Sequence, residues 1–173
     1  RAKRRNGPTL GNKPGQSSRY TKRAAAHRRS PLDIEIRPAT AADESTCLAL
    51  IEALTKSVPT PQWSALFKDL LAGSRGEVLV AEEAGAIVGV ATISYNLAIR
   101  YGSEYAQLEE LMVAPAARGK NVGGLLVEAV VDRARTRGCP EIGLYLLEAT
   151  ERNRPFYEKY GFRHVGSEMR QRL

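Results

Sequence analysis

The chain has few cysteines, no long hydrophobic run and, over its first 31 residues, no acidic residue. Its two cysteines, Cys47 and Cys139, lie far apart, without a second cysteine or a histidine at metal-ligand spacing. This pattern excludes a disulfide framework and a zinc site, and we expect two buried or half-buried thiols. The longest apolar stretch, residues 86–93, is too short to cross a bilayer, and no signal-peptide core stands near the start. We therefore expect a soluble, cytoplasmic protein without a membrane partner.

The positive charge is concentrated near the N-terminus. Residues 1–31 contain ten Lys/Arg and no Asp/Glu, whereas residues 32–173 contain 16 Lys/Arg and 19 Asp/Glu. The basic segment is rich in Gly, Pro and Ser and has almost no aliphatic residues, so burial cannot offset its conformational entropy. We predict two parts: a tail over residues 1–31, disordered unless a partner orders it, and a globular domain over residues 32–173.

A tail of this composition suits the release of counterions from RNA or DNA. It carries no base-reading pattern, so we expect phosphate contacts, for example with RNA of the ribosome. Two alternatives stay open: a nonspecific solvated tail, or an organellar targeting peptide, since the segment is rich in Arg and Ser and free of acids. The candidate nucleic-acid-binding residues are Arg4, Arg5, Lys13, Arg19, Lys22, Arg23, Arg28 and Arg29.

The remainder of the chain alternates strand and helix signals. Residues 32–36 alternate apolar and acidic side chains, as half-buried strands do. Thr40 and Asp43 form a capping-box pattern that predicts a helix continuing to Thr55, and Thr60-Pro61 predicts a second helix that stops at Gly73. The other predicted strands cover residues 77–81, 86–95, 107–113, 141–147 and the segment from Phe162 onward, and the other helices cover residues 122–137 and 154–160. This order indicates an α/β fold.

A glycine-containing loop joins the fourth predicted strand to the next helix. Its residues of interest are Pro115, Arg118, Gly119, Lys120, Gly123 and Gly124. The proline ends the strand, and the glycines let main-chain amides approach a ligand closely. The helix amino end offers unpaired amides and a partial positive charge, to which the two cations add, and this combination suits a diphosphate. A purely structural turn would also explain such a loop.

The whole segment resembles the coenzyme A loop of the GNAT superfamily of N-acetyltransferases. In that family Leu-Glu-x-Leu-x-Val is followed by x-Pro-x-x-Arg-Gly-x-Gly-x-Gly and an apolar helix. The fitting positions here are Leu108, Glu109, Leu111, Val113, Pro115, Arg118, Gly119, Gly123 and Leu126. Residues 36–43 are similar to the family's first strand and helix start, and residues 153–162 to its Asn…Phe-Tyr-x-x-x-Gly-Phe segment. The resemblance spans about residues 32–166.

The resemblance implies a mixed, mostly antiparallel sheet of six to seven strands, flanked by about four helices, with the fourth and fifth strands splayed. It implies acetyl-CoA as the cofactor and direct attack of an amine, on a small molecule or a protein, without an acyl-enzyme. The implied cofactor-binding residues are Met112 and Val113 through main-chain groups, the amides of Arg118, Gly119, Lys120, Asn121, Val122, Gly123 and Gly124, and Asn153.

The resemblance also implies catalytic roles. Tyr157 occupies the position of the general acid that protonates the leaving thiolate. Glu109 or Glu110 takes the amine proton through water, and Glu109 is favoured because it matches the family's glutamate. Strand alternation sends the two glutamates to opposite faces unless a bulge intervenes. Ordinary roles stay open as well: packing for Tyr157, a solvated charge for either glutamate, and a helix cap for Asn153.

One position departs from the family pattern. Asn121 stands where the family has the first glycine of the Gly-x-Gly pair. Asparagine tolerates left-handed backbone angles, but its side chain would stand where a diphosphate is expected. Two alternative functions therefore follow. The first is an acetyltransferase with an RNA- or ribosome-binding tail. The second is a GNAT-like module that binds coenzyme A poorly and serves as an RNA- or ribosome-associated binding protein.

Overall fold

The structure is a computed structural model that describes residues 34–171 and residue 173. The basic tail predicted over residues 1–31, together with its candidate RNA contacts, lies outside the described residues. In the described part of the chain, no helix has both the length and the apolar character needed to cross a membrane.

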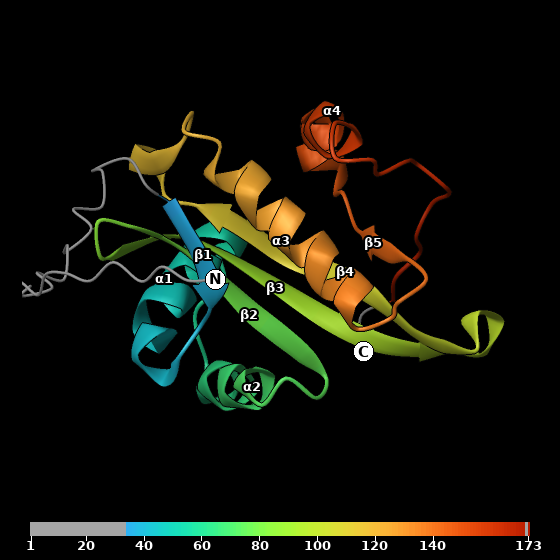
Figure 1. Ribbon diagram of the computed structural model, residues 1–173, viewed down its shortest axis with the longest axis horizontal. Coiled ribbons are helices and arrows are strands. Elements are labelled where there is room, and N and C mark those ends of the chain that lie inside the picture. The colour runs from blue at the N-terminus through green and yellow to red at the C-terminus, as the bar shows by residue number, and fades with distance from the viewer. Residues whose placement is uncertain (1–33, 172) are drawn as a thin grey trace, which may run out of the picture.

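A five-stranded sheet forms the centre of the molecule, with its strands in the order β1-β2-β3-β4-β5 (Figure 1). The strands are β1 (Ile34–Pro38), β2 (Gly76–Glu83), β3 (Ala86–Ala98), β4 (Ser103–Val113) and β5 (Ile142–Leu144). The first four pair antiparallel, and β5 pairs parallel to β4. The predicted mixed, mostly antiparallel sheet is therefore confirmed.

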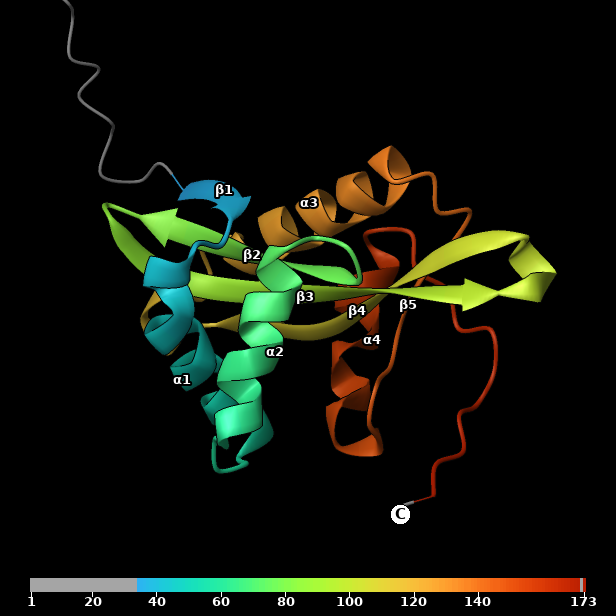
Figure 2. The same cartoon turned by 90° about the horizontal axis from the view of Figure 1, so that it is seen from below.

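Helices cover both faces of this sheet, with α1 and α2 on one side and α3 on the other (Figure 2). The helices are α1 (Glu44–Thr55), α2 (Pro61–Leu71), α3 (Val122–Thr136) and α4 (Arg154–Glu158). Successive side chains of β2 point to opposite faces of the sheet and contribute to the core on each face. Val78 and Val80 pack towards α1 and α2, whereas Leu79 and Ala81 pack towards α3. Cys47 is buried in the first layer, and Cys139 is half-buried near the end of α3, both as free thiols.

The sheet has fewer strands than predicted. Residues from Phe162 onward form no strand in the described part of the chain. Phe162 packs on the core, but the apolar side chains after it cover no surface: Val165 and Met169 are 93% and 96% exposed. The strand predicted at residues 141–147 shortens to the three residues of β5. The predicted six to seven strands are therefore five.

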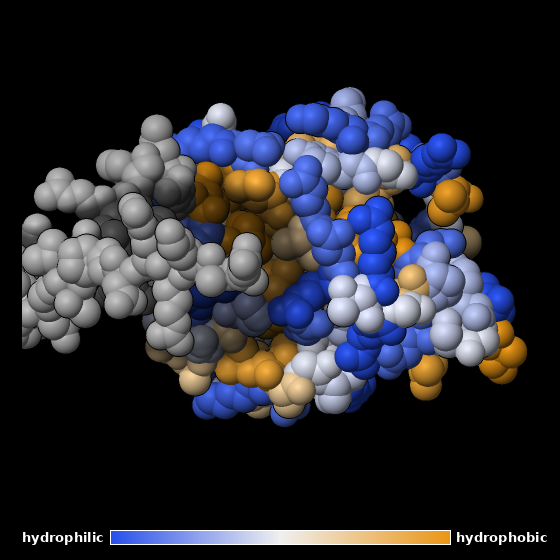
Figure 3. Space-filling view, viewed as in Figure 1, coloured by the Kyte–Doolittle hydropathy of each residue, from blue (hydrophilic) through white to orange (hydrophobic). Residues whose placement is uncertain are grey.

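The β3–β4 hairpin is longer than predicted. Pairing continues to Ala98 and Ser103, so most of the segment expected as a loop is strand. A short turn closes the hairpin at Gly102, whose φ of 64° favours glycine. Leu97 and Ile99 are exposed there, and Figure 3 shows hydrophobic side chains at this end.

The predicted capping pair is present at the start of the first helical segment. The Asp43 carboxylate accepts hydrogen bonds from the Thr40 amide at 2.7 Å and the Thr40 hydroxyl at 3.0 Å. The Arg37 guanidinium donates two further bonds, at 2.7 and 3.0 Å, and a third to Glu82 at 2.9 Å. These contacts join β1, β2 and the helix start, and they hold the pKa of Asp43 well below its usual range, chiefly through Arg37.

We predict that Asp43→Asn lowers the free energy of unfolding by about 2 kcal/mol at pH 7, because charge-assisted hydrogen bonds to Arg37 are lost. A carboxyl group whose pKa is depressed by folding stabilises fully above its unfolded pKa of about 3.9 and loses this contribution as the pH falls towards the folded pKa. The difference between wild type and variant, measured by urea unfolding, should therefore shrink below about pH 4.

The matched control is Asp132→Asn, which removes an exposed carboxylate paired with Arg135 on α3. This substitution should lower the free energy of unfolding by less than about 0.5 kcal/mol. A difference between wild type and Asp43→Asn that stays constant down to acid pH would contradict the assignment.

Candidate functional site

β4 has a free edge where β5 leaves it. The two strands pair over three residues only, ending at Leu108 opposite Leu144. β4 nevertheless continues to Val113 alongside β3. Beyond Leu108, the side of β4 that faces away from β3 has no strand partner among the described residues. This is the gap expected between splayed fourth and fifth strands.

The strand register determines which main-chain groups face this free edge. The Ala114 amide donates to the Val88 carbonyl at 2.8 Å, and alternation turns the main chain of Met112 towards β3 as well. Leu111 and Val113 therefore present their amides and carbonyls to the gap. This corrects the expectation for Met112, whose place is taken by Leu111. The alternation of a strand could have identified Leu111 from the sequence, because main-chain groups two residues apart, here those of Val113 and Leu111, face the same side.

The loop after β4 brings a row of amides to the start of α3. Gly119 and Asn121 have left-handed backbone angles, with φ of 81° and 62°. Among the described residues, the amides of Gly119, Lys120 and Asn121 donate to no protein acceptor. The first amides of α3, from Val122 to Gly124, have no partner within the helix. This end of α3 can therefore hold a diphosphate, as the sequence predicts.

The two cations of the loop are already engaged. Lys120 Nζ donates to both carboxylate oxygens of Glu83, at 2.8 and 2.9 Å. Its ammonium is therefore paired with a residue that the sequence did not single out. Arg118 Nε donates to the Val113 carbonyl at 3.4 Å, so its guanidinium lies beside the end of the free edge.

A β-bulge in β4 places both candidate glutamates on the same face of the sheet. Thr92 of β3 pairs with Glu110 and the next residue pairs with Leu108, so Glu109 is left without a partner. The extra residue offsets the usual alternation. Ser94 Oγ donates to the Glu109 carboxylate at 2.5 Å, and the Thr92 hydroxyl donates to that of Glu110. The sequence left this outcome open, because nothing in it marks the bulge.

The two carboxylates differ in environment. Glu109 is exposed, whereas Glu110 is half-buried. Burial raises the pKa of the Glu110 carboxyl, the hydrogen bond from Thr92 acts against this, and the neighbouring Glu109 charge raises it further. A carboxylate with a raised pKa is a better proton acceptor, so the structure favours Glu110 over Glu109 as the general base.

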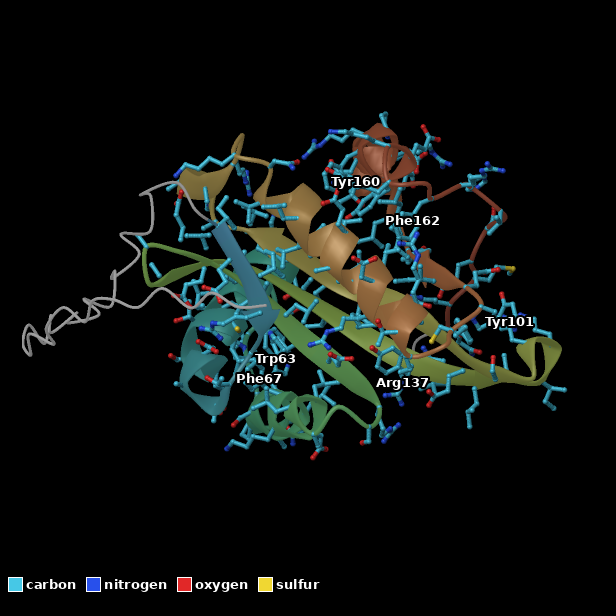
Figure 4. The ribbon with its side chains drawn as sticks, in the orientation of Figure 1. Trp63, Phe67, Tyr101, Arg137, Tyr160 and Phe162 are labelled. Carbon is cyan, nitrogen blue, oxygen red and sulfur yellow. The ribbon has the colours of Figure 1, made fainter. Side chains whose placement is uncertain are left out.

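Both glutamates line a cleft of about 620 Å³ between α2 and the sheet. Its wall from α2 includes Leu66 and Leu70. Figure 4 shows Trp63 and Phe67 on the same helix, and Phe67 is buried in the core. The remaining lining residues are Lys68, Asp69, Ala72, Ser74, Arg75, Thr92, Ile93, Ser94, Tyr95 and Asn96.

Tyr157 lies on α4 and packs with the layer that contains α3. Its ring meets Phe156 and Phe162 edge-on, with centroids 5.0 and 6.1 Å apart. The neighbouring Phe156 lies within reach of Val113 and Gly123, so α4 stands next to the free edge of β4. Burial raises the pKa of Tyr157, and the phenol keeps its proton at neutral pH, as a general acid requires.

Asn153 directly precedes α4 and is exposed. Its side chain makes no capping hydrogen bond, so the structure gives no support to a helix-cap role. Its contact with the cofactor arm stays a prediction.

A free strand edge, a row of helix amides and a cleft with two carboxylates define the class of protein: an acyltransferase in which an extended thioester cofactor lies between two splayed strands. A sequence profile of the Acetyltransferase (GNAT) family matches residues 44–162. The chain belongs to this family. It is an acetyl-CoA-dependent N-acetyltransferase.

Individual relatives agree with the family. The chain is 31% identical over 143 residues to glucosamine 6-phosphate N-acetyltransferase of Trypanosoma brucei brucei, covering 80% of this chain and 95% of the relative. It is 34% identical over 135 residues to glucosamine 6-phosphate N-acetyltransferase 1 of Oryza sativa subsp. japonica, covering 73% of this chain and 79% of the relative. A crystal structure of a Trypanosoma brucei acetyltransferase superimposes with a TM-score of 0.69 at 29% identity, covering 82% of this chain and all of that one.

We predict that Glu110→Gln lowers kcat/KM by roughly 100-fold, because a general base is lost. Glu109→Gln, the matched control, should lower kcat/KM by less than about tenfold. A base must be unprotonated to act, so wild-type kcat/KM should decrease as the pH falls through the raised pKa of Glu110. The variant should lack this acidic limb. If the decrease of kcat/KM at acidic pH disappeared in Glu109→Gln and not in Glu110→Gln, Glu109 would be the general base instead of Glu110.

We predict that Tyr157→Phe lowers kcat by roughly 10- to 100-fold, because the leaving thiolate loses its proton donor. The affinity for acetyl-CoA, measured by calorimetric titration, should hardly change. Tyr101→Phe, at the remote hairpin turn, is the control for removal of a phenol. Unchanged turnover in Tyr157→Phe would show that this residue only packs.

Proposed function

We propose that the chain transfers the acetyl group of acetyl-CoA to the 2-amino group of a phosphorylated amino sugar, glucosamine 6-phosphate being the first candidate. The observation that carries the proposal is the pair of carboxylates, Glu109 and Glu110, that the bulge in β4 places in one cleft behind the free strand edge. Two carboxylates favour the binding of a cationic amine and provide a group to receive its proton.

The names of the relatives support this choice of substrate. Both curated relatives described above are named as glucosamine 6-phosphate N-acetyltransferases. Their similarity extends over most of each chain, and it includes the region that forms the cleft.

The chemistry of the cleft also fits a polyhydroxylated amine. Thr92, Ser94 and Asn96 lie on one face of β3 and line its floor. Asn96 Nδ2 donates to the Ser94 hydroxyl at 2.8 Å, which in turn donates to Glu109. A connected row of donors and acceptors can exchange partners with sugar hydroxyls without leaving a polar group unpaired.

The proposed reaction uses groups on both sides of β4. Bound acetyl-CoA supplies the thioester carbon that the neutral amine attacks. Glu110 accepts the proton of the amine on the cleft side. Tyr157, which packs with the layer on the other side, holds a proton for the leaving sulfur. Leu111 and Val113 offer amides along the free edge to orient the thioester.

A cation at the mouth of the cleft suits a phosphate. The Arg75 carbonyl accepts the Tyr95 amide at 2.9 Å, which fixes the main chain of this residue. Among the described residues, the Arg75 guanidinium forms no hydrogen bond or ion pair. Lys68 lines the same cleft, and its ammonium lies 4.0 Å from a Glu44 carboxylate oxygen. Arg75 is therefore free to bind a phosphate in bidentate fashion.

The test compares glucosamine 6-phosphate with glucosamine in an assay of thiol release from acetyl-CoA. We expect kcat/KM to be higher for the phosphate ester by roughly 30- to 100-fold, the effect of one charge-assisted bidentate contact. Arg75→Ala should remove most of this preference, whereas Arg135→Ala, on the exposed side of α3, should keep it. Equal rates for the two sugars, or a preference that survives in Arg75→Ala, would contradict the proposal.

The RNA- or ribosome-binding role of residues 1–31 stays a prediction. It is supported by the ten cations of that segment alone. The described residues that line the cleft and form the cofactor loop all lie outside this segment.

A further inference from the structure

The cofactor loop contains a left-handed residue that is not glycine. Asn121 has φ 62° and ψ 15°, and it directly precedes α3. A side chain makes this conformation less favourable than it is for glycine, although asparagine tolerates it better than most residues. A contact that holds the Asn121 side chain would therefore favour this conformation over the others open to the loop.

Tyr160, just after α4, makes this contact. Its hydroxyl donates to Asn121 Oδ1 at 3.2 Å, and Figure 4 shows the ring on the side of α4 that faces α3. The ring itself is placed by Phe156, whose centroid lies 5.2 Å away in an edge-on arrangement. The hydroxyl thus reaches the loop from a ring that packing already orients.

Gly124 allows the two side chains to meet. A Cβ atom at this position would collide with the Tyr160 hydroxyl and with Asn121 Oδ1. At Gly123, a Cβ would lie 3.4 Å from Phe156 Cζ. Gly124 therefore leaves room for the Tyr160 hydroxyl and for Asn121 Oδ1, in addition to keeping its amide accessible.

We infer that Tyr160 is a positioning residue for the cofactor: its hydroxyl holds the Asn121 side chain over Gly124 and so fixes the left-handed turn that aims the loop amides at the diphosphate. Held in this way, Asn121 Oδ1 lies beside Gly124 and the Tyr160 hydroxyl. The loop is also tied from the other side, because Lys120 bonds to Glu83 at the end of β2. Asn121 and Tyr160 are thus a matched pair that replaces a glycine.

The inference predicts that the Tyr160 hydroxyl matters only while residue 121 is asparagine. Tyr160→Phe should weaken acetyl-CoA binding about fivefold, the effect of one hydrogen bond. In the Asn121→Gly background, where the left-handed turn needs no support, the same change should matter less than about twofold. Asn121→Gly alone should bind acetyl-CoA within about threefold of wild type. Calorimetric titration of the four proteins gives this double-mutant cycle.

A second measurement separates positioning from general destabilisation. S-acetylpantetheine lacks the diphosphate, so Tyr160→Phe should raise KM for acetyl-CoA while leaving kcat, and kcat/KM for S-acetylpantetheine, unchanged. Thermal unfolding confirms that each variant is folded. The inference is overturned if Tyr160→Phe weakens acetyl-CoA binding equally in both backgrounds, changes both acetyl donors alike, or has no effect in the presence of Asn121.

Discussion

The pairing of β4 with β3 continues to Val113, while its pairing with β5 stops at Leu108, and the site depends on this difference. A strand held on one side only presents unpaired amides and carbonyls on the other. In most proteins such an edge must be covered, whereas here it provides a template for an extended ligand. The long register with β3 keeps β4 rigid where it has lost its second neighbour, so the exposed groups remain oriented.

The bulge at Glu109 acts on the same strand in a different way. It lets two successive carboxylates face the α2 side, although Leu108 and Leu111 on either side of them pack towards α3. Burial then distinguishes the two: Glu109 is exposed, whereas Glu110 is half-buried and burial raises the pKa of its carboxyl. On the opposite side, burial raises the pKa of Tyr157 as well. Burial therefore makes Glu110 a stronger proton acceptor, while Tyr157 keeps its proton at neutral pH on the other side of the free edge.

The start of α3 shows how one small residue can serve two purposes. Gly123 and Gly124 were expected only to bring amides close to a ligand. In the structure Gly124 also leaves room for the Tyr160 hydroxyl, and Phe156 lies close to Gly123, so the segment of α4 packs against the start of α3, whose amides can hold a diphosphate. The two parts of the site are consequently fixed relative to each other by contact.

The sequence by itself determined the order of the elements as far as α4, the strands β2 and β3, the capping pair Thr40–Asp43 and the glycine-containing loop, because each depends on neighbours a few residues away. It also indicated the family, whose motifs are local. Tertiary structure alone decided the bulge that brings Glu109 and Glu110 together, the exchange of Met112 for Leu111 at the free edge, and the place of Arg75 beside the cleft. It decided, too, that the final segment would not pair and that Tyr160 would reach Asn121. These outcomes depend on register and on contacts between residues far apart in the chain, and no local pattern encodes them.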